Sequence, residues 1–508
     1  MNPGSHYHKY LSDQLALLIA QVLVYGRGVI LLPILIRTAG VGVYGSYVLM
    51  LSTASFVFAA SSLGVGFRFQ RFIPSAPDNE SRSQLFYSQF AFQLVMVLLL
   101  GMVLIAFEGR INDSLLKGDG TVSGWAIALQ VLALCLFAQS TDFFRYTHRI
   151  RLFAVATGSA PYLSLGLIGL AFWLHVVPSV DILLNLTSAA MLLVALVLFI
   201  GVVKEIGVRF VVPTLVQIRD DIRLGFPLVL TYVLDFVLSA SDRFLLAFFL
   251  SAQAVGYYAP AYTLASVVLM IPKAIGVALP PLLSKLVDAK QTEDAAKLTG
   301  AALRFYLLLA IPFVVGSALI GPELLRLLAN KDVAEKAGHI PGLLALGMLF
   351  YGLNLILSSS VAFVTLRTTN VVIANVIAGV TSVSLNTLLI PLFEDIAVPA
   401  SVAASSFFLS YVFLFKRLQP YMDVRIRLPF VSRTVLASAI MAGTLIVLKS
   451  VITNYILIVT VGIPVAAGTY ALGAWKTGAL SKTDLQILKG LIPGWMKVRG
   501  MESSGDAE

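Results

Sequence analysis

The feature that most constrains the fold of this 508-residue chain is its series of long apolar runs. Each run holds about twenty residues, the length that a helix needs to cross the hydrocarbon core of a bilayer. Fourteen membrane-spanning helices are expected, at approximately residues 14–36, 43–66, 85–107, 124–144, 152–175, 182–203, 224–249, 256–283, 299–320, 340–365, 371–392, 396–415, 433–451 and 455–475. Only 12% of the residues are charged, about half the share in soluble domains, so the sequence predicts an all-α polytopic membrane protein.

Positive charges gather on one side of these predicted helices. With a cytoplasmic N-terminus, and with residues within five positions of a span end assigned to the adjoining side, 26 of the 36 Lys and Arg residues are cytoplasmic, 7 are on the outer side and 3 lie within spans. The positive-inside rule predicts this asymmetry, so both termini of the chain are expected in the cytoplasm. Because the net charge of +10 is spread over short loops, we expect a lipid bilayer and not nucleic acid as the partner.

The chain also repeats itself. The segment RTAGVGVYGSYVLM (37–50) follows the first predicted helix, and FLSAQAVGYYAPAY (249–262) follows the seventh. The two segments match at a glycine and at a tyrosine: Gly45 with Gly256, and Tyr47 with Tyr258. Six helices separate the copies, so both begin on the same side of the membrane. The sequence thus predicts a parallel internal repeat, which is a usual architecture of transporters.

Five parts of the chain follow from this repeat. Residues 1–203 are expected to form an N-terminal six-helix lobe, and residues 224–415 a second such lobe. Residues 204–223 would be the cytoplasmic linker between the lobes. Residues 433–475 hold two extra membrane helices, and residues 476–508 form a cytoplasmic tail in which an interfacial amphipathic helix or a partly ordered segment is expected.

Charged residues within the predicted helices are the candidate functional residues. The seventh helix, LTYVLDFVLSASDRFLLAFFL, carries Asp235, Asp242 and Arg243, and two further helices carry Arg27 and Lys273. A charge near the middle of a bilayer costs roughly 2.5–3.5 kcal/mol on insertion scales. Such residues therefore need a partner or a polar path.

Two interpretations of these charges remain open. In the first, Lys273 pairs with Asp235 or Asp242 and fixes the packing of the helices. In the second, the charges line a water-filled cavity in which Arg27 and Lys273 hold an anionic group, while the carboxylates tune these cations or take up H⁺ or Na⁺. Prolines in the same helices are expected to bend them around such a cavity: Pro33, Pro260 and Pro272.

Arg68 lies near Arg71 at the cytoplasmic end of the second predicted helix. It either follows the positive-inside rule or makes the first contact with an incoming pyrophosphate. The sequence lacks the phosphate-binding loop GxxxxGK[ST], the zinc motif HExxH and any Cys/His cluster. No catalytic residues, metal site or cofactor are therefore expected.

Two stretches resemble a known family. The segments AQVLVYGRGVILLPILIRTAGVGVYGSYVLM (20–50) and SDRFLLAFFLSAQAVGYYAPAYTLA (241–265) are similar to polysaccharide-biosynthesis exporters. These are the Wzx-type lipid-linked oligosaccharide flippases of the multidrug/oligosaccharidyl-lipid/polysaccharide (MOP) superfamily. The resemblance covers about the first 300 residues well and implies a cationic central cavity. Fourteen helices resemble the lipid II flippase branch, where two extra helices form a groove for the polyprenyl tail, whereas many oligosaccharide flippases have twelve.

The resemblance and the buried charges together predict a flippase of the bacterial inner membrane. It would move a polyprenyl-pyrophosphate-linked oligosaccharide outward by alternating access and could serve polysaccharide polymerase machinery. A cation-coupled multidrug exporter of the same superfamily is the first alternative, although Arg27 and Lys273 do not suit cationic drugs. A membrane-embedded polymerase or ligase is the second, and its usual large outer loop is missing from this chain. The saccharide, the coupling ion and the branch of the superfamily remain open.

Overall fold

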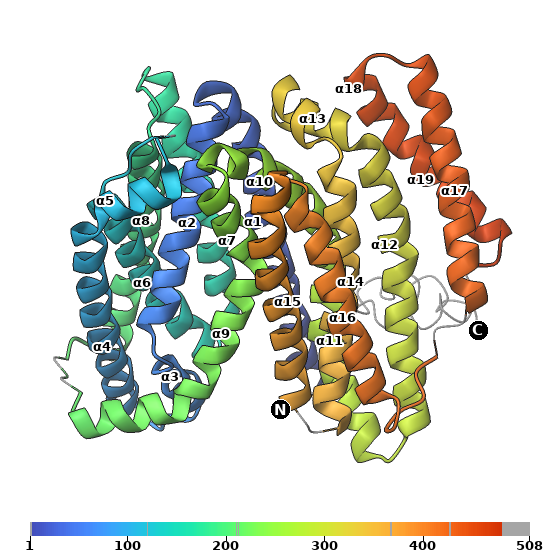
Figure 1. Cartoon of the computed structure of the whole chain (residues 1–508). Helices are drawn as coiled ribbons and strands as arrows, with labels where there is room; N and C mark the ends of the chain where they lie inside the picture. The colour runs from blue at the N-terminus through green and yellow to red at the C-terminus, as the bar shows by residue number, and fades with distance from the viewer. Residues whose placement is uncertain are drawn as a thin grey trace, which may run out of the picture. The chain divides into compact units, whose positions relative to one another are not determined.

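The structure is a computed structural model that describes residues 3–118, 120–209, 211, 213–365, 368–425 and 428–479 (Figure 1). These residues form helices joined by short turns, and no strand occurs among them. The tail beyond residue 479, with its predicted interfacial helix, lies outside the described residues.

Contacts divide the chain into two compact units, each assembled from separate segments. Unit 1 comprises Met1–Thr263, Leu328–Ala337 and Gly379–Pro399, and unit 2 comprises Leu264–Leu327, Gly338–Ala378 and Ala400–Glu508. The two predicted six-helix lobes follow the order of the chain instead, and they remain a prediction.

Unit 1 contains the helices of the first half of the chain and those that begin the second half. They are α1 (Pro3–Thr38), α2 (Val41–Ser61), α3 (Gly66–Phe72), α4 (Asn79–Ala106), α5 (Glu108–Ile111), α6 (Gly124–Tyr146), α7 (Ile150–Trp173), α8 (Val180–Ile206), α9 (Leu215–Phe249), most of α10 (Ala252–Ser266), α13 (Lys331–Ala337) and the end of α15 (Thr369–Phe393). Within this unit α6 packs against both α4 and α8, and α1 packs against α7 (Figure 1).

Side chains at the helix starts explain where several of these helices begin. Asp78 caps α4 by accepting a hydrogen bond from the backbone N–H of Ser81, at 2.7 Å. Thr214 caps α9 in a reciprocal capping box with Gln217. The α9 helix therefore begins nine residues before the expected span at residue 224, and it continues without interruption to Phe249.

Unit 2 contains the remaining helices. They are α11 (Met270–Asp288), α12 (Thr292–Leu328, of which Leu328 belongs to unit 1), α14 (Ile340–Thr365), the start of α15, α16 (Val398–Leu418, mostly in this unit), α17 (Leu428–Val451), α18 (Tyr455–Leu457) and α19 (Ile463–Lys476). The two extra helices of the sequence prediction correspond to α17 and to α18 with α19. They pack on α12, where Lys449 forms an ion pair with Glu323 at 2.8 Å and Tyr470 donates a hydrogen bond to the carbonyl of Leu308.

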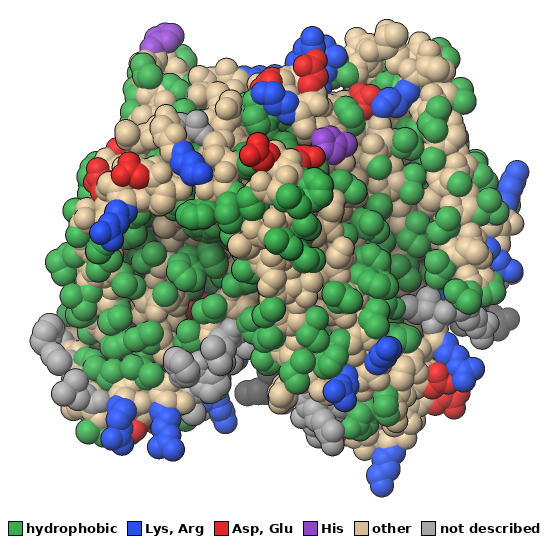
Figure 2. All heavy atoms as spheres, in the orientation of Figure 1, with side chains coloured by type: hydrophobic (Ala, Val, Ile, Leu, Met, Phe, Trp, Pro, Cys, Tyr) green, Lys and Arg blue, Asp and Glu red, His purple; other side chains and the backbone are tan. Residues whose placement is uncertain are grey.

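Thirteen helices among the described residues are long and apolar enough to cross a membrane. Each coincides with one of the fourteen predicted spans. The one remaining predicted span, 224–249, corresponds to α9, a helix of 35 residues that carries several charges. Figure 2 shows hydrophobic side chains along the sides of the helices and charged side chains mainly toward the helix ends. The chain is therefore an all-α, multi-pass membrane protein.

The predicted span 256–283 is confirmed as a membrane-length segment, Ala252–Gly276, but it is not α-helical throughout. A 3₁₀ turn at Val267–Leu269 separates α10 from α11. Pro272 lies in the first turn of α11, and it lacks the N–H that would donate to the carbonyl of Val268 in an uninterrupted α-helix. By contrast, Pro33 and Pro260 lie inside helices that continue through them.

Candidate functional site

Arg27 lies on α1 and directs its guanidinium group toward hydroxyl groups of unit 1. Its Nη2 atom donates hydrogen bonds to Tyr47 Oη and to Ser164 Oγ, each at 3.1 Å. Tyr47 in turn shares a 2.8 Å hydrogen bond with Thr187. The Nε atom of Arg27 is buried and has no hydrogen-bond partner in the part of the chain that the structure describes. The hydrogen-bond partners of this cation among the described residues are thus neutral hydroxyls.

A second arginine, Arg243 on α9, has a similar environment. Its guanidinium carbon lies 4.3 Å from the centre of the Tyr262 ring, which is a cation–π distance. Its Nε atom is also buried without a hydrogen-bond partner among the described residues. Tyr44 on α2 is close enough to interact electrostatically with both Arg27 and Arg243. Two arginines from α1 and α9 therefore share one neighbourhood around a buried tyrosine.

A carboxylate lies beside this pair. Asp242 on α9 accepts a hydrogen bond from Tyr258 Oη at 2.5 Å, and its other oxygen accepts one from the backbone N–H of Arg243 at 2.8 Å. Tyr258 is the tyrosine that the sequence repeat matches with Tyr47. In each copy, this tyrosine contacts a charged residue of the preceding helix: Arg27 in the first copy and Asp242 in the second.

These contacts form a mixed-charge cluster that we call the arginine cluster: Arg27, Tyr44, Tyr47, Asp242, Arg243, Tyr258 and Tyr262. An arginine offers several N–H donors in a planar fork, which matches the oxygens of a phosphate or carboxylate. Because the Nε donors of Arg27 and Arg243 are buried and have no partner in the described part of the chain, they are available to donate hydrogen bonds to an anion.

The matched glycines of the repeat form a direct helix contact next to this cluster. A Cβ atom on Gly45 would lie 2.6 Å from the backbone nitrogen of Gly256 and would overlap the carbonyl oxygen of Ala252. A Cβ atom on Gly256 would lie 2.8 Å from Val41 and would overlap its carbonyl oxygen. Ala252 is the repeat equivalent of Val41, so the contact is reciprocal, as an approximate two-fold relation between two copies requires.

A second contact joins α9 to the turn before α3. Arg68 on α3 forms a 3.0 Å ion pair with Asp221 on α9. Gly64 lies four residues before Arg68, and Gly225 lies four residues after Asp221; the backbones of these two glycines touch. A Cβ atom on either glycine would lie within 2.7 Å of the Cα atom of the other. Gly64 also has a φ of +82°, which favours glycine. Burial raises the pKa of Asp221 above its usual range, although Arg68 opposes this shift.

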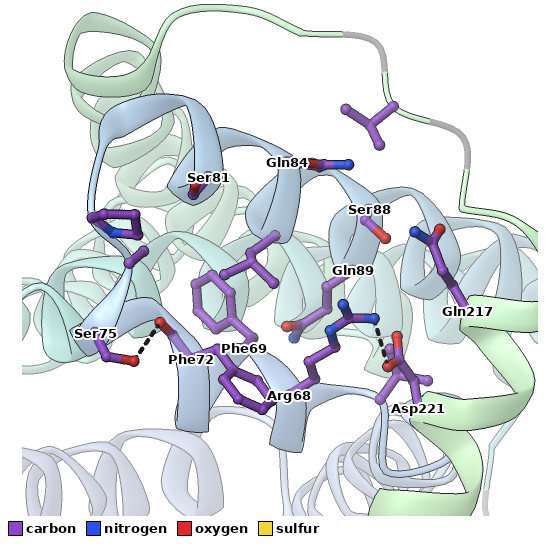
Figure 3. A pocket seen from close by; sticks show the side chains of 15 residues that line it. Arg68, Phe69, Phe72, Ser75, Ser81, Gln84, Ser88, Gln89, Gln217 and Asp221 are labelled. Atoms are coloured by element: carbon purple, nitrogen blue, oxygen red, sulfur yellow. Dashed lines mark hydrogen bonds and ion pairs between the residues drawn. The ribbon is translucent and has the colours of Figure 1, made fainter.

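The Arg68–Asp221 ion pair lies in the wall of a cavity of about 370 Å³ between α3, α4 and the start of α9 (Figure 3). Amide and hydroxyl side chains line it together with two phenylalanines. The labelled residues are Arg68, Phe69, Phe72, Ser75, Ser81, Gln84, Ser88, Gln89, Gln217 and Asp221. Phe69 also belongs to a buried aromatic cluster with Phe86 and Phe143, which supports this wall.

The structure brings some of the predicted site residues together and leaves others apart. Arg27, Asp242 and Arg243 belong to the arginine cluster, whereas Arg68 belongs to the cavity. Asp235 is exposed on α9, and Lys273 is exposed on α11 in unit 2. The pairing of Lys273 with a carboxylate stays a prediction.

Two groups of residues at these sites were not predicted from the sequence. Tyr47 and Tyr258 were noted only because they match in the two copies of the repeat. A tyrosine that occurs in both copies, next to helices that carry charges, could also have indicated a partner for those charges. Asp221 and Gln89 gave no such signal, because their partners lie far away in the sequence: 153 residues for the bond to Arg68 and 50 for the bond to Gln139.

Comparisons with known proteins agree with this architecture. The family model described as "Polysaccharide biosynthesis protein" matches residues 11–287, more than half of the chain, and the MatE model matches residues 227–392. A protein of Haloferax volcanii, "Probable flippase AglR", is 33% identical over 86 residues. That match covers 17% of this chain and only 18% of the relative's length.

Two solved structures share the fold. The lipid II flippase MurJ, in an inward closed conformation, aligns with a TM-score of 0.73 and 16% identity, over 91% of this chain and 98% of that chain. An inward-facing multidrug resistance MATE transporter of the MOP superfamily aligns with a TM-score of 0.62 and 12% identity, over 80% of this chain and 98% of that chain. The chain therefore belongs to the polysaccharide biosynthesis protein family of the MOP superfamily of transporters.

Proposed function

We propose that the chain is a flippase that carries a polyprenyl-pyrophosphate-linked oligosaccharide across a bacterial inner membrane, from the cytoplasmic to the outer leaflet. The arginine cluster is the observation that carries this proposal. Its two arginines, Arg27 and Arg243, each keep a buried N–H without a partner among the described residues, and phosphate oxygens are suitable acceptors. The protein would be a transporter without catalytic chemistry of its own.

Movement of the lipid would use two lobes of six helices in alternating access, with both termini in the cytoplasm. The reciprocal contact of Gly45 and Gly256 would then lie at the outward end of α2, and the contact of Gly64 and Gly225 at its cytoplasmic end. The hydrophilic head would pass through a polar path that includes Arg27 and Lys273, while the polyprenyl tail would stay in lipid beside α17 and α19.

Asp242 favours a second candidate, a cation-coupled exporter related to the MATE transporters. Its carboxylate is held by Tyr258 inside a helix bundle, where uptake of H⁺ or Na⁺ would change the charge next to Arg243. The MatE model also matches the segment that contains this residue. H⁺ or Na⁺ could equally drive a flippase. Asp242 is therefore relevant to which ion drives transport, whereas Arg27 and Arg243 are relevant to which substrate is transported. Asp235, exposed on the same helix, is a further proposed contributor to coupling.

Depletion of the protein in its own organism tests the two candidates. For a flippase, polyprenyl-pyrophosphate-linked oligosaccharide accumulates in the cytoplasmic leaflet and surface polysaccharide is lost. Unchanged lipid-linked pools together with new sensitivity to cationic drugs would favour the exporter. Unpolymerised units that accumulate in the outer leaflet would instead indicate a polymerase or ligase.

Replacing Lys273 with alanine is expected to reduce export at least about tenfold, because a cation that helps to hold the pyrophosphate is lost. Lys285→Ala, in the last turn of the same helix, is the matched control and should leave export near the level of the original protein. Export is measured as surface polysaccharide at equal amounts of inserted protein. Normal export by the Lys273 variant would remove this residue from the proposed site.

A further inference from the structure

We propose that the cavity between α3, α4 and the start of α9 is a saccharide-binding site that recognises sugar hydroxyl groups. The identity of this saccharide as the glycan of the transported lipid rests on the proposed function, whereas the binding itself can be tested without it. The site is separate from the arginine cluster, since none of the residues lining the cavity belongs to that cluster.

The size and the walls of the cavity suit a small polar ligand. Its volume of about 370 Å³ falls within the ~300–1,000 Å³ that is common for ligand-binding cavities. Phe72 lines it with a side chain that is 43% exposed, and Phe69 lies in a buried aromatic cluster. Aromatic rings of this kind can pack against the C–H face of a sugar while polar groups bind its hydroxyls.

The polar groups of the cavity include donors and acceptors in balance. Arg68 supplies N–H donors, and Asp221, with which it is paired at 3.0 Å, supplies carboxylate oxygens that accept. Gln84 and Ser88 on α4 can each donate and accept (Figure 3). A sugar hydroxyl also does both. A pyrophosphate esterified at both ends, as in the proposed cargo, only accepts hydrogen bonds, and the carboxylate of Asp221 would repel it, so these side chains favour a neutral polyol as the ligand.

Gln89 gives independent support for a ligand that can donate hydrogen bonds. The side chain lines the cavity and is only 9% exposed. Its Nε2 atom donates to Gln139, but its buried Oε1 atom has no hydrogen-bond partner among the residues that the structure describes. A buried acceptor without a donor is costly. A hydroxyl group that reaches the base of the cavity would donate to this oxygen, which the fully esterified pyrophosphate of the cargo could not do.

The position of α9 completes this site. Asp221 faces Arg68 only while the first turns of α9 lie against α3, an arrangement that the Gly64–Gly225 backbone contact allows. A saccharide that binds both side chains would therefore stabilise this arrangement of the two helices.

Saturation-transfer NMR on the full-length protein in lipid nanodiscs tests the proposal. N-acetylglucosamine, glucose and galactose serve as saccharide probes, and inorganic pyrophosphate serves as the anionic probe. At least one of the sugars is expected to bind. Gln89→Leu and Ser88→Phe, which remove the buried acceptor and fill the cavity, are expected to weaken this binding at least about tenfold.

Gln93→Leu is the matched control. Gln93 lies one turn further along α4, accepts a hydrogen bond from the same Gln139 and does not line the cavity. It should disturb the chain of buried amides as much as Gln89→Leu does, but saccharide binding should stay within about twofold of the original protein. Equal loss in both variants would assign Gln89 a structural role and overturn the proposal.

Two other outcomes would also overturn it: no sugar binds, or pyrophosphate binds at this cavity and the sugars do not. Transport of a lipid-linked oligosaccharide is measured separately with the same preparation. A protein that binds sugar here but moves no such lipid would contradict the proposed function and leave the site intact. A protein that moves the lipid but binds no sugar in this cavity would support the proposed function and overturn the saccharide-binding site.

Discussion

Replacing Gly256 with alanine is expected to abolish transport and to lower the melting temperature of the protein by at least about 3 °C. The added methyl group would overlap the carbonyl oxygen of Val41, and backbone atoms cannot move aside as a flexible side chain can. Alanine is otherwise the better helix former by roughly 1 kcal/mol. A loss of stability would therefore reflect the contact between α2 and α10 and not helix propensity.

Gly45→Ala should have the same effect, because the repeat places it opposite Gly256. The double variant should lose less stability than the sum of the two single variants, since one separation of the helices accommodates both methyl groups. Gly42→Ala is the control on α2, where an added Cβ meets no atom within 4 Å. Normal melting and transport in the Gly256 variant would show that the two helices do not depend on this contact.

Replacing Arg27 with methionine is expected to reduce transport at least about tenfold without lowering stability. The described partners of Arg27 are neutral hydroxyls, Tyr47 and Ser164, so its removal leaves no opposite charge unpaired. Replacing a buried charge with an apolar residue of similar volume is often neutral or stabilising. The combination of retained stability and lost transport would distinguish an anion-binding role from a packing role.

Arg27→Lys is the informative companion variant. Lysine keeps the positive charge but not the planar fork, so transport should fall between that of the original protein and that of the methionine variant. Melting temperature in nanodiscs and transport in proteoliposomes are the two measurements. A methionine variant that is unstable yet transports normally would show that Arg27 only holds α1 in place.

Hydrophobic runs predict the spans of this protein well, because the bilayer demands about twenty apolar residues for each helix. The helix α9 is harder to predict, since its capping box at Thr214 extends it through a polar segment that hydropathy assigns to a linker. Pro272 was expected to bend its helix, and the 3₁₀ turn at Val267–Leu269 lies just before it. Pro260 was expected to do the same but lies inside α10, so a proline alone does not locate an interruption.

The candidate site was predictable only in part, for a physical reason. Charges within apolar runs identify Arg27, Asp242 and Arg243, since such charges are costly without a role. Their partners depend on packing between helices that are distant in the sequence, and Ser164 lies 137 residues from Arg27. The reciprocal contact of Gly45 and Gly256 was partly predictable. The sequence repeat matches the two glycines, but only the structure shows that their backbones touch.

Transport of a defined lipid by the purified protein tests most directly whether this protein is a flippase for lipid-linked oligosaccharides. The protein is reconstituted into proteoliposomes that carry a polyprenyl-pyrophosphate-linked oligosaccharide, and the fraction accessible to an external glycosidase is followed over time. We expect the protein to accelerate movement of this lipid between leaflets, and we expect Arg27→Met to reduce this acceleration at least about tenfold. Movement no faster than in empty liposomes under H⁺ or Na⁺ gradients of either direction, together with uptake of a cationic drug, would contradict it.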